Sequence, residues 1–250
     1  LLEQERAYLS DPPFWDARAT PEPKESTYDQ QAGKIKKAKA PWVVAVSGGS
    51  DSLALVLLLQ RYCQKKNQPL LSVTVHHGLR KESFEEAQWV QQLLTSCGLP
   101  HAILTLQRTA PKKGIPAWAR QQRYALLHQY CTHHRASHLF LGHHLDDQWE
   151  TRMMRLMRHS TSKGLSGMAS LQKRNHEQGS IVYVRPLLSF PKKMIKATLI
   201  KEGQRWCEDP SNKNLSYTRN KIRATQSTQY LPPFLKGNGV AHCATLKSAF

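Results

Sequence analysis

The feature that most constrains the fold is a β-branched run that passes directly into a glycine- and serine-rich loop. Residues 43–46 read Val-Val-Ala-Val, residues 47–52 read Ser-Gly-Gly-Ser-Asp-Ser, and an apolar run follows over 53–59. This pattern predicts a buried strand, a tight loop and a helix that begins at the loop. Glycines let the backbone approach a ligand closely, and the first N–H groups of a helix attract negative charge. The segment therefore predicts an anion-binding site, with its three serine hydroxyls as further donors.

The loop is not a Walker A loop, because that motif needs a lysine that reaches the phosphates. Asp51 instead lies inside the predicted anion site, where it would repel a phosphate unless a divalent cation joined the two. An acid in this place indicates a nucleotide bound with Mg²⁺, and Asp51 is the candidate metal ligand. The alternative is a serine- and glycine-rich turn without a ligand. Ser-Gly-Gly-Ser-Asp-Ser resembles the PP-loop of enzymes that split ATP between its α- and β-phosphates, which implies ATP as the nucleotide.

Strand and helix patterns alternate after Trp42. Strands are predicted at 42–46, 70–75, 101–106 and 138–142, and helices at 51–66, 83–97, 116–135 and 146–158. This order predicts an α/β fold, namely a doubly wound, Rossmann-like parallel sheet with right-handed crossovers. Ligands of such sheets bind at the carboxyl ends of the strands. The loop at 47–52, His76-His77-Gly78 and His143-His144 are therefore expected to converge on one crevice.

Charge divides the chain into unequal parts. Residues 151–250 hold 18 Lys and Arg against 4 Asp and Glu, whereas residues 1–150 hold 18 against 14. We predict an N-terminal extension over 1–40, a nucleotide-binding domain over 41–160, and a small basic extension over 161–250 that completes the catalytic domain. The extension offers a short strand at 181–184 and a helix near 191–203. A basic excess this uneven favours nucleic acid as a partner over a merely solvated basic face.

A second group of polar residues follows the strand at 138–142. Asp147 and Glu150 are three residues apart on a predicted helix and share a face, and His143 lies about one turn earlier. Helix N-capping explains one acid but not this whole group. We interpret it as a cage for a cationic or metal-bound reactant that includes a general base. Arg120 and Arg123 are also three residues apart, and phosphate binding and an exposed basic face explain them equally well.

Several segments together resemble tRNA(Ile)-lysidine synthetases. They are Val75 to Arg80, Ala119 to Tyr124, His143 to Thr151, Gly164 to Met168, Arg185 to Leu188, Glu208 to Asn212 and Arg219 to Arg223, in order and at family-like spacing. The resemblance implies a two-step reaction at the wobble cytidine of the tRNA(Ile) with a CAU anticodon. ATP first adenylates the C2 carbonyl oxygen and releases pyrophosphate. The ε-amine of free L-lysine then attacks C2 and expels AMP, which leaves lysidine.

The resemblance also implies roles for individual residues. The ATP site is Ser47, Gly48, Gly49, Ser50, Asp51 and Ser52, with Mg²⁺ on Asp51. Arg123 is expected near the triphosphate or the adenylate, and His143, Asp147 and Glu150 are expected to form the lysine and reaction pocket. Arg219 and Arg223 are candidates for contacts with tRNA.

Other features bound the expected setting. No run approaches the ~20 apolar residues of a membrane span, and the five cysteines are widely spaced without a C-x-x-C pair, so we expect a reduced cytoplasmic protein. The oligomeric state is left open, with a homodimer as one candidate. The family usually has Gly-Ser-Gly where this chain reads His159-Ser160-Thr161. The chain ends at Phe250 whereas many relatives continue, so we expect either a minimal form or a truncated one that binds tRNA poorly.

Two alternatives stay open at this stage. A PP-loop tRNA thiolase would use cysteines near the nucleotide, whereas Cys63, Cys97 and Cys131 lie on predicted helices as apolar filler. A non-catalytic RNA-binding relative would explain the altered loop and the missing C-terminal region. The intact loop at 47–52 and the intact Asp147–Glu150 pair favour the enzyme.

Overall fold

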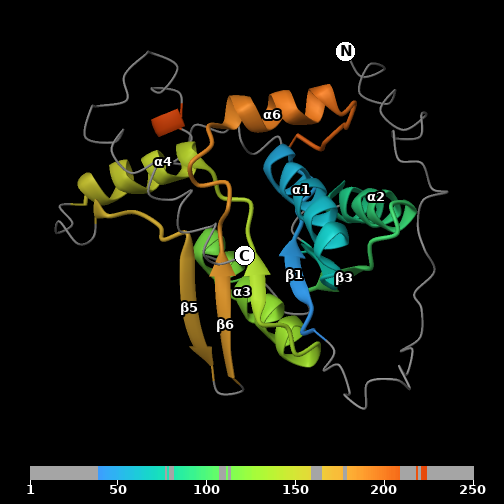
Figure 1. Cartoon of the computed structure of the whole chain (residues 1–250). Coiled ribbons are helices and arrows are strands. Elements are labelled where there is room, and N and C mark those ends of the chain that lie inside the picture. Colours follow the sequence, from blue (N-terminus) through green and yellow to red (C-terminus); the bar gives the residue numbers. More distant parts are fainter. Residues whose placement is uncertain are drawn as a thin grey trace, which may run out of the picture.

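A six-stranded sheet forms the centre of the molecule, with strand order β3-β2-β1-β4-β6-β5 (Figure 1). The computed structural model of the chain describes residues 39–76, 78, 82–106, 111, 114–158, 165–176, 179–208, 218 and 221–223. The strands are β1 (Trp42–Ala45), β2 (Leu70–His76), β3 (His101–Thr105), β4 (His138–Phe140), β5 (Leu171–His176) and β6 (Gly179–Val184). Neighbouring strands pair in parallel except β5, which pairs antiparallel with β6.

The helices follow the strands in the predicted order. They are α1 (Ser50–Lys66), α2 (Glu82–Ser96), α3 (Ile115–His133), α4 (Leu145–Leu156) and α6 (Lys192–Lys201). Every strand and helix that the sequence pattern predicts is present, with bounds that agree within two residues. In the described part of the chain, no helix has both the length and the apolar character that a membrane span requires.

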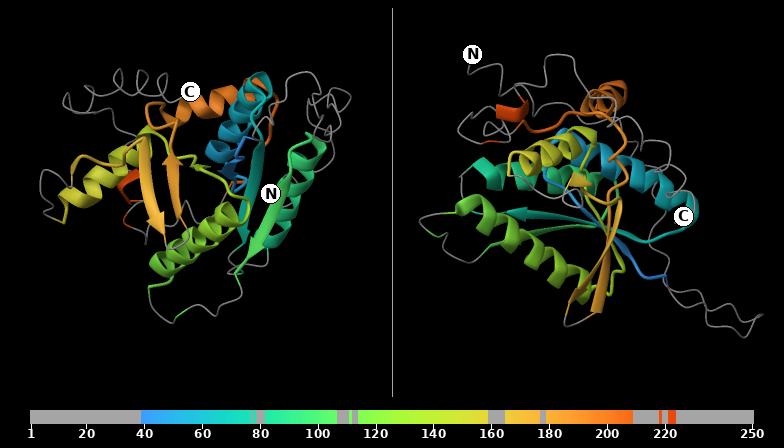
Figure 2. Two further views of the ribbon diagram at one scale, coloured as in Figure 1. Left: turned by 60° about the horizontal axis from the view of Figure 1, so that its bottom comes forward. Right: turned by 90° about the vertical axis from the view of Figure 1, so that its left-hand side faces the viewer.

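Side chains alternate between the two faces of the sheet, and each face has its own core. Val44 of β1 packs with buried residues of α1, α2 and α6. The preceding residue, Val43, packs on the other face with Leu127 of α3 and Leu139 of β4. Helices therefore cover both faces (Figure 2). This arrangement confirms the predicted doubly wound α/β sheet.

The sequence pattern does not predict the edge strand β5. Its residues read Leu-Gln-Lys-Arg-Asn-His, which lacks the β-branched and aromatic residues typical of strands. The strand forms because its backbone pairs with β6 from Leu171↔Val184 to His176↔Gly179. Charged side chains on an edge strand also discourage pairing with other chains. Residues after 160 thus add β5, β6 and α6 to the same structure, and the predicted domain boundaries stay a prediction.

Candidate active site

The strand order makes a topological switch point between the carboxyl ends of β1 and β4, and we refer to this place as the crevice. The chain proceeds from β1 to β2 on one side of β1, whereas it returns from β3 to β4 on the other side. The loops after these two strands therefore diverge, and ligands of open α/β sheets bind at such a point. The loop at 47–49 follows β1, and Gly142 to His144 follow β4. The structure brings these two predicted motifs together, whereas His77 of the third lies outside the described residues.

The loop after β1 is held in shape by its own polar groups. Gly48 has a φ of +82°, and a Cβ at this position would lie 3.0 Å from Val90 Cγ2 and 3.4 Å from Cys207 Sγ, so the turn requires glycine. Ser52 Oγ accepts the Ser47 N–H at 3.1 Å and donates to the Gly49 carbonyl at 3.0 Å. The hydroxyl of Ser52 is thus engaged within the loop, whereas Ser47 is exposed.

Gly142 lets the end of β4 approach the first turn of α1. A Cβ at Gly142 would lie 3.1 Å from the Ser52 backbone nitrogen and 3.2 Å from the carbonyl carbon and oxygen of Asp51. These atoms are backbone and cannot rotate away. The absence of a side chain therefore sets how closely the two halves of the crevice meet.

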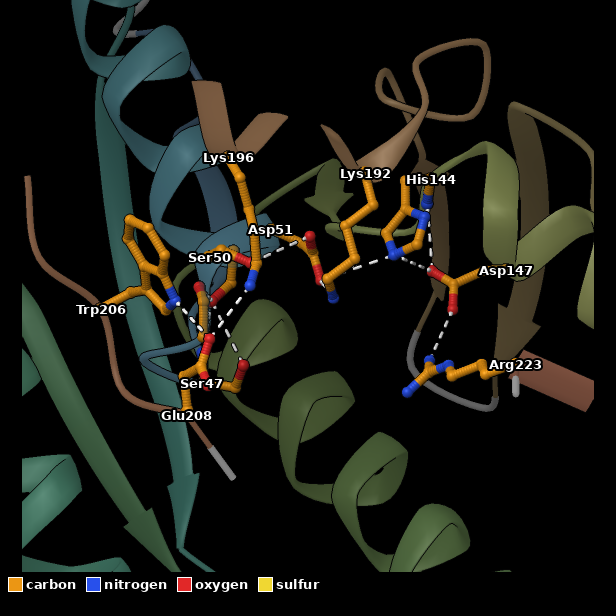
Figure 3. Close-up of polar contacts among 12 residues, drawn as sticks. Ser47, Ser50, Asp51, His144, Asp147, Lys192, Lys196, Trp206, Glu208 and Arg223 are labelled. Atoms are coloured by element: carbon orange, nitrogen blue, oxygen red, sulfur yellow. Dashed lines mark hydrogen bonds and ion pairs between the residues drawn. The ribbon is translucent and has the colours of Figure 1, made fainter. Parts of the chain in front are cut away.

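Asp51 sits between the side chains of Lys192 and His144 across this crevice (Figure 3). Lys192 Nζ, at the start of α6, donates to Asp51 Oδ2 at 3.0 Å, and His144 Nε2 lies 3.5 Å from the same oxygen. Burial alone would raise the pKa of Asp51, but His144 and Lys192 together lower this pKa to about 2. Burial likewise opposes protonation of His144, yet Asp51 and Asp147 raise its pKa. The Asp51 carboxylate is therefore ionised at neutral pH.

Two further carboxylates continue this row of alternating charges. Asp147 Oδ2 accepts the His144 backbone N–H at 3.1 Å and lies 3.4 Å from His144 Nε2. Arg223 Nη2 lies 3.6 Å from Asp147 Oδ1. The same guanidinium donates through Nε and Nη2 to both oxygens of Glu150, which is fully buried. The row thus runs Lys192, Asp51, His144, Asp147, Arg223 and Glu150.

His143 differs from His144 in its electrostatic environment. Burial lowers the pKa of His143 to about 4, although the charge of Asp147 opposes this; the charges of Arg185, Arg120 and Arg123 lower it further. Among the described residues, His143 Nδ1 has no hydrogen-bond partner. His143 is therefore neutral at physiological pH and presents a buried nitrogen without a fixed partner.

The remaining predicted site residues are distributed unevenly. Arg123 lies on α3 within electrostatic range of His143, and its guanidinium lies 5.8 Å from the Tyr124 ring centroid. Arg219 and the loop at 159–161 lie outside the described residues. Sequence reasoning did not single out Lys192, because a lysine after a proline at the start of a basic helix carries no local signal. Its partner Asp51 is 141 positions away.

A cysteine lies beside the loop after β1. The Cys207 N–H donates to the Gly48 carbonyl at 2.9 Å, and burial raises the pKa of its thiol to about 11. This thiol is therefore protonated and weakly nucleophilic. Cys63, Cys97 and Cys131 are buried, and none of the cysteines in the described ranges is in a disulfide. The described residues also hold no group of three or more His, Cys, Asp or Glu that could bind a metal ion.

Comparisons with known proteins give a consistent result. The family model described as the PP-loop domain matches residues 23–228. The tRNA(Ile)-lysidine synthase of Bradyrhizobium diazoefficiens is 44% identical over 197 residues, which cover 78% of this chain and 53% of that protein. The tRNA(Ile)-lysidine synthase of Rhodopseudomonas palustris is 43% identical over 189 residues, which cover 75% of this chain and 54% of that protein. The chain thus spans about half the length of these curated relatives.

A solved structure shows the same fold at low sequence identity. It is the U34-tRNA thiolase NcsA from Methanococcus maripaludis with its [4Fe-4S] cluster, with a TM-score of 0.66 and 17% identity over 84% of this chain and 74% of that one. The likeness concerns the fold alone.

Proposed function

Because this chain belongs to the PP-loop domain family, we propose that it ligates free L-lysine to C2 of the wobble cytidine in the tRNA(Ile) with a CAU anticodon. ATP is converted to AMP and pyrophosphate, and the product is lysidine. The observation that carries the proposal is one crevice that joins a glycine-rich anion loop to a row of alternating charges. The similarity to tRNA(Ile)-lysidine synthases over three quarters of the chain supports the identity of the substrates.

The ATP phosphates would bind at residues 47–52, at the N-terminus of α1. The backbone N–H groups of that turn and the helix dipole favour negative charge there. Mg²⁺ fits this site, because Asp51 offers an ionised carboxylate and Mg²⁺–nucleotide sites commonly use one or two carboxylates together with phosphate oxygens. Bound there, Mg²⁺ would neutralise phosphate charge. Lys192, which contacts Asp51, adds a second positive charge at the same place.

The chemistry of the first step requires activation of a poor electrophile. The C2 carbonyl oxygen of cytidine attacks the α-phosphorus of ATP, the bond to pyrophosphate breaks, and C2 then carries AMP as a good leaving group. The anion loop would hold the triphosphate in line for this attack, which is mainly a matter of positioning. Arg123 on α3 is the proposed contact to the triphosphate or the adenylate.

The second step requires a neutral amine. Asp147 would anchor the lysine ammonium and take up the proton that the ammonium must lose to become a neutral amine, since its carboxylate lies beside His144 and Arg223. His143 is neutral at physiological pH and would accept the proton that the amine loses as nitrogen bonds to C2 and AMP departs. Glu150 would act by holding Arg223 through a two-point ion pair. We further propose a cytoplasmic location, whereas the homodimer stays a prediction.

The test is to measure pyrophosphate release from ATP with the CAU tRNA(Ile), with and without lysine, and then the mass of the tRNA. We expect pyrophosphate release that depends on this tRNA, and a mass gain of one lysyl group when lysine is present. Asp147→Asn should abolish lysine incorporation, whereas Asp146→Asn should retain it. Asp146 is the matched control because it is the neighbouring acid in the first turn of α4.

Three results would contradict the proposal or one of its assigned roles. Pyrophosphate release without lysine incorporation would indicate another RNA modification by a PP-loop enzyme, such as thiolation. Binding of tRNA without any pyrophosphate release would indicate a non-catalytic RNA-binding protein. Full lysine incorporation by Asp147→Asn would remove the proposed role of that carboxylate.

A further inference from the structure

A cavity lies between α3 and the β5–β6 edge of the sheet, on the face of the sheet that α3 covers. Its volume is about 420 Å³, within the usual range of ligand pockets. It is lined chiefly by Arg120, Tyr124 and His128 of α3, Arg174 of β5, Tyr183 of β6, and Arg185, which directly follows β6. We refer to it as the arginine–tyrosine pocket. None of the proposed ATP, Mg²⁺ or lysine residues lines it.

Two stacked tyrosine rings form a rigid aromatic wall of this pocket. The ring centroids of Tyr124 and Tyr183 lie 5.5 Å apart with an interplanar angle of 16°. The Tyr183 hydroxyl is hydrogen-bonded to His128 Nε2, and both residues are buried. Arg120 lies 5.1 Å from the Tyr124 ring centroid, and Arg185 lies 5.7 Å from that of Tyr183. The guanidinium groups are thus held against the rings before any ligand binds.

Among the described residues, acids do not compensate the charge of the pocket. None of the described Asp or Glu residues lines it, and none of their carboxylates forms an ion pair with Arg185. Arg185 is only 5% exposed. It donates to the Ala169 carbonyl at 2.8 Å and to Gln172 Oε1 at 3.2 Å, and its Nε has no partner among the described residues. A buried cation that lies near other cations and has an unused donor is costly unless an anion completes the site.

The pocket adjoins the catalytic crevice. Phe140 of β4 pairs in parallel with Val184 of β6, so His143 and Arg185 leave the sheet from neighbouring strands at the same edge. Arg120 and Arg185 also lie near enough to His143 to influence its protonation. A polynucleotide with one base in the crevice could therefore place an adjacent nucleotide in the pocket.

We propose that the arginine–tyrosine pocket binds a nucleotide of single-stranded RNA adjacent to the nucleotide that reacts in the crevice. Arginine forks bind phosphate oxygens in pairs, and tyrosine rings stack on bases without regard to their sequence. The arginines of the cavity therefore match the phosphate of a nucleotide, and the tyrosine rings match its base. The proposal rests on the proposed function, because it takes RNA as the substrate.

The experiment measures RNA binding directly, without lysidine formation. An RNA hairpin with a CAU anticodon loop is titrated with the full chain by fluorescence anisotropy at several salt concentrations. Arg120 and Arg174 are exposed, so their replacement by alanine spares the buried Arg185. We expect the double variant Arg120→Ala with Arg174→Ala to bind the hairpin about tenfold more weakly, with a smaller salt dependence. Arg135→Ala is the matched control, since Arg135 is exposed at the opposite end of α3.

A second pair of variants tests the aromatic wall. Tyr124→Leu should weaken RNA binding about tenfold. Tyr124→Phe keeps the ring and loses only the hydroxyl that accepts from Arg120 at 3.4 Å, so it should weaken binding much less. Thermal unfolding of each variant excludes a folding defect as the cause. An equal loss of RNA affinity in Tyr124→Leu and Tyr124→Phe would overturn the proposed stacking of a base on the Tyr124 ring.

The remaining outcomes separate this proposal from the proposed function. If the arginine variants weaken binding of ATP or pyrophosphate but not of RNA, the pocket serves a free phosphate compound and the proposal is wrong. If neither ligand is affected, the proposal is also wrong. If the hairpin binds through the pocket but the unchanged protein releases no pyrophosphate with tRNA, the pocket stands and the lysine-ligase proposal fails.

Discussion

Replacement of Gly142 by alanine tests how closely the two halves of the crevice must meet. The new Cβ would lie 3.1 Å from the Ser52 nitrogen and 3.2 Å from the Asp51 carbonyl group, and ordinary contacts begin near 3.4 Å. The first turn of α1 must therefore move by about 0.3 Å relative to β4. Overpacking of this kind costs about 1–3 kcal/mol in the free energy of unfolding. Each kcal/mol lowers the melting temperature by about 2–4 °C in a chain of this size.

The same shift should weaken the proposed catalysis, because it displaces Asp51 and the start of α1. A misplacement of 1 Å lowers the rate of a reaction about 100-fold. If the logarithm of the loss scales with the displacement, a shift of about 0.3 Å lowers kcat/KM for ATP on the order of fourfold. Thermal and urea unfolding measure the first effect, and tRNA-dependent pyrophosphate release measures the second.

Gly49→Ala is the matched control for the stability measurement without ligand. Gly49 has a φ of −73°, and its new Cβ would come no nearer than 3.7 Å to Ser47 Oγ. We expect its free energy of unfolding to change by less than about 1 kcal/mol, since alanine restricts the unfolded chain but is a poorer N-cap of α1 than glycine. If Gly142→Ala is as stable as Gly49→Ala, the argument from close backbone approach is refuted.

Three further predictions concern the charged groups. Arg223→Met should lower the free energy of unfolding by about 3 kcal/mol, because the fully buried Glu150 carboxylate loses its guanidinium partner. In a double-mutant cycle, adding Glu150→Gln should recover much of the lost free energy. Strictly additive effects of the two substitutions would argue against an interaction between Arg223 and Glu150. The lowered pKa of Asp51 stabilises the fold above about pH 4, and this contribution is lost as the pH falls towards 2. Lys192 helps to lower that pKa, so in Lys192→Ala the stability measured by urea unfolding should depend less on pH between about 4 and 2. The ring of His143 should titrate near pH 4 when it is followed by NMR. In the unfolded chain the ring binds its proton near pH 6.5, so acidification from pH 6.5 to pH 4 should destabilise the fold. Titration of His143 at its ordinary pKa would contradict its buried position.

Much of the fold could be predicted because its signals are local. The β-branched run at Trp42 to Ala45 and the apolar run that follows the glycines indicate a strand and a helix through their own periodicity. The positive φ of Gly48 is likewise a property of a short turn, and the sequence marks it with two consecutive glycines. The carboxylates Asp147 and Glu150 are three positions apart on one helix, so their proximity follows from helix geometry alone.

The sequence by itself therefore determined the order of the strands and helices other than β5, the anion loop, and the pairing of residues within one turn of a helix. The tertiary structure alone decided which distant groups meet: Lys192 with Asp51, Arg223 with Glu150, and β5 with β6. It also placed Arg174 and Arg185 beside Arg120 to form one pocket. The physical reason is that hydrophobic periodicity and turn geometry act over a few residues, whereas contacts between distant side chains depend on how whole strands and helices pack.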